Sequence, residues 1–404
     1  MDSPEYPGFA TRAIHAGAPS TRPGGAQGDV VSPIHLSSTF RLDEVPDVSL
    51  MDLDPSHGEY LYSRLGNPTR QVLEERIASL TGGTHGFAFG SGTGAVLTTV
   101  LASAQAGDAI VAFDDLYGGS LKLLDQLAEE RLEMDVNLVD ARDESKVAAA
   151  IDDDTALVLM ETPTNPLLHL CDISAIADLT EQHGVPLAVD NTFSSPYFQQ
   201  PLDLGADIVI HSTTKYLNGH SDGLGGAIAT NDDDLAEQIG FLQRVGLGNP
   251  MAPFDAYMVL RGMKTLAARM DIHQRNAMGI AEYLHGHEGV RRVRYPGHES
   301  HPQYDLASEQ MGGFGGVLSF ELDGDASHAR RFLEALEVFS LGVSLGGVES
   351  LIELPASMTH ESIDEEVRID RGITETLIRV SVGIEEFDDL IRDLERGFAA
   401  AFGE

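Results

Sequence analysis

The segment PLAVDNTFSSPYFQQPLDLGADIVIHSTTK, residues 186–215, contains two short apolar runs that are each followed by polar residues. The runs at 187–189 and 208–210 have the length and composition of buried strands. Similar runs at 86–89, 109–113 and 156–160 alternate with helical patterns at 70–80, 95–104, 121–131, 144–151 and 173–183. This alternation predicts an α/β fold with a mostly parallel sheet that helices cover on both faces.

The 404 residues exceed what a single hydrophobic core usually serves, which is roughly 250–300 residues, so we expect two domains. The first 65 residues are rich in Pro, Gly and Ser, and we expect an irregular N-terminal arm there. Residues 66–259 form the larger predicted domain. Predicted strands at 317–321 and 377–382 and a helix at 388–401 indicate a smaller C-terminal α/β domain at 260–404.

The charge of the chain excludes several kinds of partner. Its 64 acidic and 26 basic side chains give a net charge of −38, and only four residues are lysines. A surface of this kind repels nucleic-acid phosphates and anionic lipid headgroups, so we expect no nucleic-acid or membrane partner. The scarcity of lysine and the excess of acid also suit a salt-rich cytoplasm, and a halophilic protein is our hypothesis.

The sequence shows no pattern of a secretory leader or of a membrane-spanning segment. The opening residues lack a basic and apolar leader, and no apolar run approaches membrane-spanning length. The single cysteine, Cys171, allows no internal disulfide. We therefore expect a soluble cytoplasmic protein.

Asp190 and Lys215 follow neighbouring predicted strands. Ligands of open parallel sheets bind at the carboxyl ends of the strands, so both side chains should face one crevice. Taken alone, each residue has a simpler explanation: Asp190 could cap a helix or be solvated, and Lys215 could be a solvated surface residue. Together they suit pyridoxal 5′-phosphate, which a lysine holds as a Schiff base while an acid keeps its pyridine nitrogen protonated.

Other polar residues reach the same predicted edge. The segment GSGTG at 90–94 lies between a strand and a helix, where backbone N–H groups can hold a phosphate, although a tight turn without a ligand would look similar. Tyr117 can stack on a flat cofactor or pack under a loop. Arg379 interrupts an apolar strand, so it either binds a carboxylate in a cleft or forms an ion pair with Glu385 or Glu349.

Two other chemistries find no support in the sequence. The pairs His285 with His287 and His298 with His301 do not match a zinc-binding helix motif, so we expect no metal site. A serine hydrolase is disfavoured because the two Gly-x-Ser-x-Gly matches, at 219–223 and 342–346, do not lie between a predicted strand and a predicted helix, as a nucleophile elbow requires.

A series of motifs resembles the Cys/Met metabolism family of pyridoxal-phosphate enzymes, from about residue 11 to the C-terminus. The motifs are YSRLGNPT (62–69), SG (91–92), DDLYGG (114–119), ETPTNP (161–166), VDNTF (189–193), HSTTKY (211–216), NGHSD (218–222), SLGGVES (344–350), PASMTH (355–360) and RVSVG (379–383). The resemblance implies the aspartate-aminotransferase-like fold, also called fold type I, and a homotetramer built from two active dimers.

The resemblance also implies roles for individual residues. Lys215 would be the Schiff-base lysine and the base that moves protons, Asp190 the partner of the pyridine nitrogen, and Tyr117 the stacking residue. The remaining cofactor contacts would be the backbone amides of Gly92 and Thr93, the hydroxyls of Ser212 and Thr214, and Tyr62 and Arg64 reaching the phosphate of the neighbouring subunit. Arg379, with Asn165 and Ser344, would bind the substrate carboxylate.

One departure concerns the phosphate site. The family usually has Met or Leu in place of Thr93 and Ala in place of Gly94. Since position 93 acts through its backbone amide, we expect the site to be retained.

The implied reaction is γ-replacement or γ-elimination at cystathionine or O-acylhomoserine, as in cystathionine γ-synthase and γ-lyase. Glu349 is available for a distal amino group and Lys122 for a distal carboxylate. A methionine γ-lyase is less expected because Gly119 stands where those enzymes carry a cysteine. O-Acylhomoserine sulfhydrylase and cystathionine β-lyase are further alternatives, and a non-catalytic protein that binds the cofactor is disfavoured by the presence of both Lys215 and Asp190.

Overall fold

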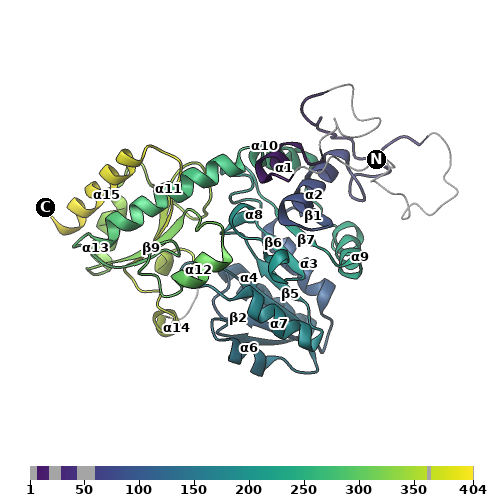
Figure 1. Cartoon of the computed structure of the whole chain (residues 1–404), viewed down its shortest axis with the longest axis horizontal. Helices are drawn as coiled ribbons and strands as arrows, with labels where there is room; N and C mark the ends of the chain where they lie inside the picture. Colours follow the sequence, from purple (N-terminus) through teal and green to yellow (C-terminus); the bar gives the residue numbers. More distant parts are fainter. Residues whose placement is uncertain (1–6, 18–28, 43–59, 362–364, 404) are drawn as a thin grey trace.

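The computed structural model describes residues 7–17, 29–42, 60–361 and 365–403, which form two sheets flanked by helices (Figure 1). The larger sheet has the strand order β1-β7-β6-β5-β4-β2-β3. Its strands are β1 (His85–Phe89), β2 (Ala109–Phe113), β3 (Asp135–Val139), β4 (Thr155–Glu161), β5 (Leu187–Asp190), β6 (Ile208–His211) and β7 (Gly226–Thr230). Only β7 runs antiparallel to its neighbours, which confirms the predicted mostly parallel sheet.

Helices cover both faces of this sheet, as the alternation of side chains along its strands shows. Phe87 and Phe89 of β1 belong to a core cluster that includes α3 (Gly92–Ser103) and α7 (Ile173–His183). The intervening Ala88 belongs to another cluster, which includes α2 (Pro68–Thr81) and α10 (Pro253–Met263). Since successive strand residues point to opposite faces, the two clusters lie on opposite sides of the sheet.

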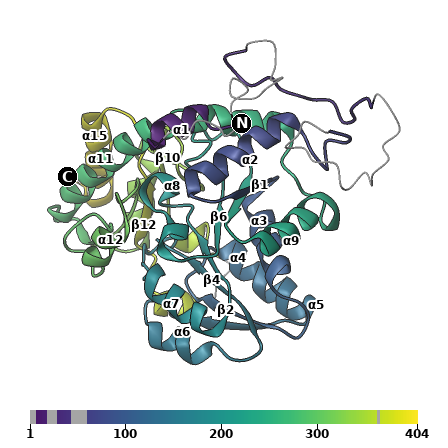
Figure 2. The ribbon, with the colours of Figure 1, turned by 45° about the vertical axis from the view of Figure 1, so that its right-hand side comes forward.

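The smaller sheet has the order β10-β11-β12-β9-β8, and all its pairs except β10 with β11 are antiparallel. Its strands are β8 (Val290–Arg294), β9 (Val317–Leu322), β10 (Ser340–Leu341), β11 (Leu351–Glu353) and β12 (Leu377–Ser381). A third core cluster joins it to α11 (Leu266–His285), α13 (Ala326–Glu334) and α15 (Phe387–Phe402). Figures 1 and 2 show α11 running beside this sheet toward the larger one. The predicted domain boundary at residue 260 lies within α10 and stays a prediction.

Several elements differ from the sequence-based expectation, among them β8, β10 and β11, which were not predicted. The N-terminal arm was expected to be irregular, but Phe9–His15 form helix α1. Strands β3 and β7 were not expected, since β3 exposes most of its side chains at the sheet edge and β7 consists largely of small residues. Much of the predicted arm, residues 1–6, 18–28 and 43–59, lies outside the described residues.

The remaining described helices are α4 (Gly118–Leu123), α5 (Glu130–Leu132), α6 (Glu144–Ala150), α8 (Ser195–Phe198), α9 (Asp233–Phe241), α12 (Tyr304–Gln310) and α14 (Glu365–Asp370). Within the described parts of the chain, no helix has the length and apolar character needed to span a bilayer.

Helix α10 packs directly on the backbone that follows Lys215. A Cβ atom added at Gly262 would lie 2.1 Å from the carbonyl oxygen of Asn218. In contrast, a Cβ at Gly240 of α9 would meet its nearest atom, Cε1 of Phe87, at 3.4 Å. The close approach of α10 therefore depends on glycine at position 262.

We predict that Gly262→Ala lowers the free energy of unfolding by about 1–3 kcal/mol, the usual cost of overpacking a filled interior. Gly240→Ala is the matched helical control and should be neutral or stabilising by up to about 1 kcal/mol, because alanine favours helix. Urea denaturation of both variants measures the difference. Equal stabilities for the two variants would contradict the packing argument.

Candidate active site

The carboxyl ends of three neighbouring strands define the candidate site. Glu161 of β4 and Asp190 of β5 are register partners, and Asp190 in turn pairs with Ile210 of β6. The segment from Ser212 to Lys215 follows β6 directly. The parallel topology thus gathers two carboxylates and the lysine-bearing segment at one edge of the sheet.

Asp190 is held by the residue two positions after it. Its carboxylate accepts hydrogen bonds from the backbone N–H of Thr192 at 3.0 Å and from its hydroxyl at 2.5 Å. The same hydroxyl accepts the N–H of Ser212 at 2.8 Å, which ties Asp190 to the segment after β6. Burial raises the pKa of Asp190 to about 6, while the Thr192 bonds and the charge of Lys215 act in the opposite direction.

Glu161 is a buried carboxylate to which the sequence analysis gave no role. It accepts the backbone N–H of Tyr117 at 2.7 Å and so fixes the start of α4. Burial, and secondly the charge of Asp190, raise the pKa of Glu161 well above its usual value. The available signal was its position at the end of an apolar run, the same position that singled out Asp190.

Lys215 lies between the two sheets. Its Nζ donates a hydrogen bond to Oγ of Ser344 at 2.8 Å. Burial, followed by the positive charge of Arg379, lowers the pKa of Lys215 to about 8, and the charges of Glu353 and Asp190 oppose this shift. The amine is therefore more readily neutral than that of an ordinary lysine, as a nucleophile requires.

Arg379 of β12 is buried, and its two terminal nitrogens contact residues of the smaller sheet and of the loop after β4, while its Nε has no hydrogen-bond partner among the described residues. Its Nη1 lies 2.9 Å from Oε1 of Glu353, the register partner on β11, and also donates to Oδ1 of Asn165 at 3.0 Å. Its Nη2 donates to the carbonyl of Ser344 at 2.5 Å. The expected grouping of Arg379 with Asn165 and Ser344 is therefore present.

The ion-pair alternatives considered for Arg379 were wrong. The carboxylate of Glu385 instead accepts the N–H and hydroxyl of Ser350, at 2.6 and 2.9 Å. Glu349 forms no ion pair with Arg379 among the described residues, and the acid that neutralises Arg379 is Glu353. No sequence signal marked Glu353, because its pairing depends on the register between β11 and β12.

Ser344 serves Lys215 with its hydroxyl and Arg379 with its carbonyl. Its φ of 95° lies in the left-handed region, which costs a residue other than glycine about 1–3 kcal/mol. The two hydrogen bonds hold Ser344 in this conformation. Backbone strain is thus located where the lysine and the arginine meet.

The N-terminus of α3 forms a cradle for an anion. Ser91 caps this helix by accepting the N–H of Gly94 at 3.0 Å, and the N–H groups of Gly92 and Thr93 belong to its first turn. A Cβ at Gly92 would lie 3.1 Å from Oγ of Ser212, so glycine keeps this space open. A phosphate fits such a helix terminus.

Thr214 and Tyr117 complete the surroundings of the cradle and the lysine. The hydroxyl of Thr214 accepts the N–H of Gly225 at 3.0 Å, which fixes its position one residue before Lys215. The ring of Tyr117 is 47% exposed, so a flat molecule could stack on it. An amine, a carboxylate, an anion cradle and an open aromatic face thus fit pyridoxal phosphate.

The other predicted site residues lie apart from this cluster. Tyr62 and Arg64 are exposed, with the guanidinium 5.8 Å from the ring centroid, and Arg64 donates to the carbonyl of Arg244. Lys122 is exposed on α4 and Glu349 is half-buried. Among the described residues, none of these four side chains contacts Lys215 or Arg379 through a hydrogen bond or ion pair.

A metal centre finds no ligands in the described ranges, where no three His, Cys, Asp or Glu side chains are grouped suitably. The histidines named above take other positions. The rings of His285 and His298 lie 4.5 Å apart, and His301 contacts the carbonyl of Leu168.

Comparison with known proteins identifies relatives over nearly the whole chain. The model of the Cys/Met metabolism PLP-dependent enzyme family matches residues 10–399. A cystathionine gamma-lyase from Dictyostelium discoideum is 46% identical over 98% of this chain and 99% of its own length. A cystathionine beta-lyase from Lactococcus lactis is also 46% identical, over 95% of this chain and 97% of its own.

Solved structures agree with these sequence relatives. The crystal structure of a cystathionine gamma synthase from Xanthomonas oryzae pv. oryzae, in complex with cystathionine, superimposes with a TM-score of 0.92. The two proteins are 43% identical, and the match covers 99% of this chain and 100% of the other. The chain therefore belongs to the Cys/Met metabolism family of enzymes that depend on pyridoxal phosphate.

Proposed function

We propose that this protein is a transsulfuration enzyme that acts at the γ-carbon of cystathionine or an O-acylhomoserine, as a cystathionine γ-lyase or γ-synthase. The observation that carries the proposal is the group formed by Lys215, Ser344 and Arg379, in which a proton-carrying amine lies beside a carboxylate-binding guanidinium. The names of the relatives and of the Xanthomonas structure support cystathionine as the substrate.

In this proposal the cofactor is held by residues from several elements. Lys215 binds it covalently, Asp190 faces its pyridine nitrogen and Tyr117 stacks on its ring. The amides of Gly92 and Thr93 and the hydroxyls of Ser212 and Thr214 hold its phosphate. Tyr62 and Arg64 are assigned to the phosphate of a neighbouring subunit, which is consistent with their exposure.

The substrate carboxylate is assigned to Arg379. Glu353 and Asn165 hold one side of the guanidinium, and the carbonyl of Ser344 fixes another, so the fork has one orientation before substrate arrives. Because Ser344 contacts both side chains, an amino acid whose carboxylate is bound by Arg379 would lie near the amine of Lys215. Preorganisation of this kind reduces the entropy cost of reaching the reactive geometry.

The chemistry of the reaction is divided between the cofactor and the protein. Bound pyridoxal phosphate supplies an electron-accepting ring that makes the Cα proton of an attached amino acid acidic. Lys215, released from its covalent bond, removes that proton and returns it at neighbouring carbons. Tyr117 assists at the substrate amine and the leaving group, and Glu349 and Lys122 are assigned to the distal amino and carboxylate groups.

We also propose that the active form is a cytoplasmic homotetramer in a salt-rich cell. The exposed Tyr62, Arg64 and Tyr117 suit a site completed by a second subunit, and the net charge of −38 suits high salt. Light scattering should give a mass near four chains of 43.4 kDa, and the unfolding midpoint should rise with added KCl. A monomer that retains its cofactor, or a midpoint insensitive to KCl, would contradict the respective proposal.

The reaction itself is tested with cystathionine in a high-salt buffer. A γ-lyase should cleave the bond between the γ-carbon and the sulfur of cystathionine and release cysteine and 2-oxobutyrate. A γ-synthase should instead form this bond from O-acylhomoserine and cysteine. Lys215→Ala should lose the turnover by at least about a thousandfold, because one residue serves as both covalent anchor and base. Homocysteine and pyruvate as the main products would instead show a β-lyase.

The reactivity of Lys215 should follow its lowered pKa. Because only the neutral amine attacks an aldehyde, cofactor attachment to the apoprotein should accelerate about tenfold per pH unit up to about pH 8 and then level off. Borohydride trapping and mass spectrometry measure the rate. In Glu353→Gln the plateau should begin at lower pH, because a charge that raises the lysine pKa is removed. A plateau beginning near pH 10 would contradict the burial argument.

A further inference from the structure

A second cavity, with a volume of about 800 Å³, lies where the loop after β4 meets β8 of the smaller sheet. Four arginines line it, Arg142, Arg291, Arg292 and Arg294, together with two aspartates, Asp140 and Asp143. Lys215, Asp190 and Arg379 are not among its lining residues, so it is distinct from the candidate active site. Its volume is within the range of about 300–1,000 Å³ that small-molecule sites occupy.

The charge of this arginine-lined cavity differs from the acidic charge of the chain as a whole. Another cavity of about 970 Å³ is lined by seven carboxylates and by no lysine or arginine. Those seven are Asp178, Glu181, Asp203, Asp207, Asp232, Asp234 and Glu237. In a chain with a net charge of −38, a pocket where cations outnumber anions is a local exception. Such a pocket attracts anions from a surface that otherwise repels them.

Two of the arginines are paired with carboxylates of the protein. Arg142 is bound to Asp140 through Nε at 2.7 Å and Nη2 at 2.9 Å. Arg291 forms an exposed ion pair with Asp323 at 3.0 Å. These two side chains line the cavity, and each already has part of its hydrogen-bonding capacity taken by the protein.

The other two arginines retain unused donors. Arg292 and Arg294 lie on the same face of β8, because the buried Val293 between them points to the opposite face. Arg294 binds Glu321 through Nη2 at 2.9 Å, but its buried Nε has no partner. Arg292 is exposed and makes no hydrogen bond or ion pair within the described parts of the chain. Planar guanidinium donors of this kind match the oxygens of a phosphate group.

We propose that this cavity binds a small molecule that carries a phosphate group, with the exposed guanidinium of Arg292 as its principal donor and Arg294 beside it on the same face of β8. His301 in the lining does not supply the charge. His301 contacts the carbonyl of Leu168 through Nε2 and accepts the N–H of Gln303 through Nδ1, an arrangement that requires a neutral ring. The arginines therefore carry the recognition, and the cavity volume leaves room for the organic part of a phosphate ester.

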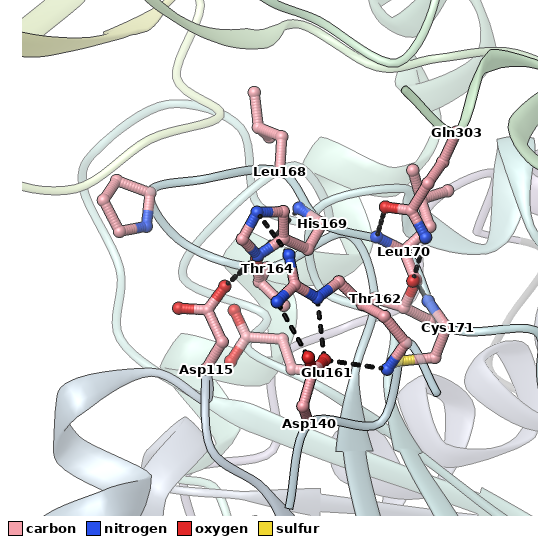
Figure 3. A network of polar contacts seen from close by, with 12 residues as sticks. Asp115, Asp140, Glu161, Thr162, Thr164, Leu168, His169, Leu170, Cys171 and Gln303 are labelled. Carbon is pink, nitrogen blue, oxygen red and sulfur yellow. Dashed lines mark hydrogen bonds and ion pairs between the residues drawn. The ribbon is translucent and has the colours of Figure 1, made fainter. Parts of the chain in front are cut away.

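The arginine-lined cavity is connected to the loop that carries Asn165. Figure 3 shows Thr164 and His169 converging on Asp115, with contacts of 2.6 and 2.9 Å to its Oδ2. The other ring nitrogen of His169 lies 3.2 Å from Nη1 of Arg142, which lines the cavity. A ligand that displaces Arg142 would therefore move the loop that fixes Asn165 on Arg379, so we expect occupancy to change the KM for substrate.

Pyrophosphate is a suitable probe, because it offers phosphate oxygens without an organic part. Calorimetric titration of the holoenzyme at constant ionic strength should detect binding. Arg292→Ala should weaken that binding at least tenfold, and Arg292→Gln is the second variant should the alanine protein fail to fold. The matched control is Arg330→Ala, which removes an exposed arginine of α13 outside the cavity lining and should leave the affinity unchanged.

The alternative is that pyrophosphate binds in the active site of the holoenzyme, where Arg379 also attracts anions. Binding there would persist in both Arg292 variants and would compete with cystathionine. The proposal is overturned if the Arg292 variants bind pyrophosphate as tightly as the parent protein does, or if the holoenzyme binds none. It is supported if pyrophosphate alters the KM for cystathionine in the parent and in Arg330→Ala but not in Arg292→Ala.

Discussion

The buried ion pair between Arg379 and Glu353 fixes the geometry on which the candidate site depends. A guanidinium removed from water is costly unless its charge and its donors are matched, and breaking such a pair typically costs 3–5 kcal/mol. Here Glu353 matches the charge from the neighbouring strand, while Asn165 contributes from the loop after β4 of the other sheet. Because its partners come from both sheets, Arg379 sets the position of the smaller sheet over the carboxyl edge of the larger one.

The same pair also affects the pKa of Lys215. The charge of Arg379 lowers the pKa of this lysine and that of Glu353 raises it, so the two effects partly cancel and burial decides the outcome. Ser344 adds a geometric constraint, since its strained backbone places its hydroxyl on the lysine and its carbonyl on the arginine. The amine is thereby held close to the guanidinium that we assign to the substrate carboxylate. Within the described residues the amine itself forms no ion pair with a carboxylate.

The sequence predicted the site residues at the carboxyl edge of the larger sheet better than those that the smaller sheet contributes. Asp190 and Lys215 follow apolar runs, and parallel strands deliver such residues to one place, so a local pattern was sufficient. Glu353 lies in a strand of three residues, and its role follows from an antiparallel register that no local pattern encodes. The strand β3 was missed for a related reason, since its exposed side chains lack the apolar run that marks a buried strand.

Two carboxylates at the ends of β4 and β5 extend this argument to cofactor retention. Asp190, with a pKa of about 6, is largely ionised near neutral pH, whereas burial and the charge of Asp190 favour the protonated form of Glu161. A positive charge placed against Asp190, such as that of a protonated pyridine nitrogen, stabilises its ionised form and lowers its pKa further. By linkage, the affinity for such a cation falls as the pH drops below about 6 and Asp190 takes up a proton. The carboxylate assigned to the pyridine nitrogen is thus ionised under neutral conditions, while its buried neighbour Glu161 favours its protonated form.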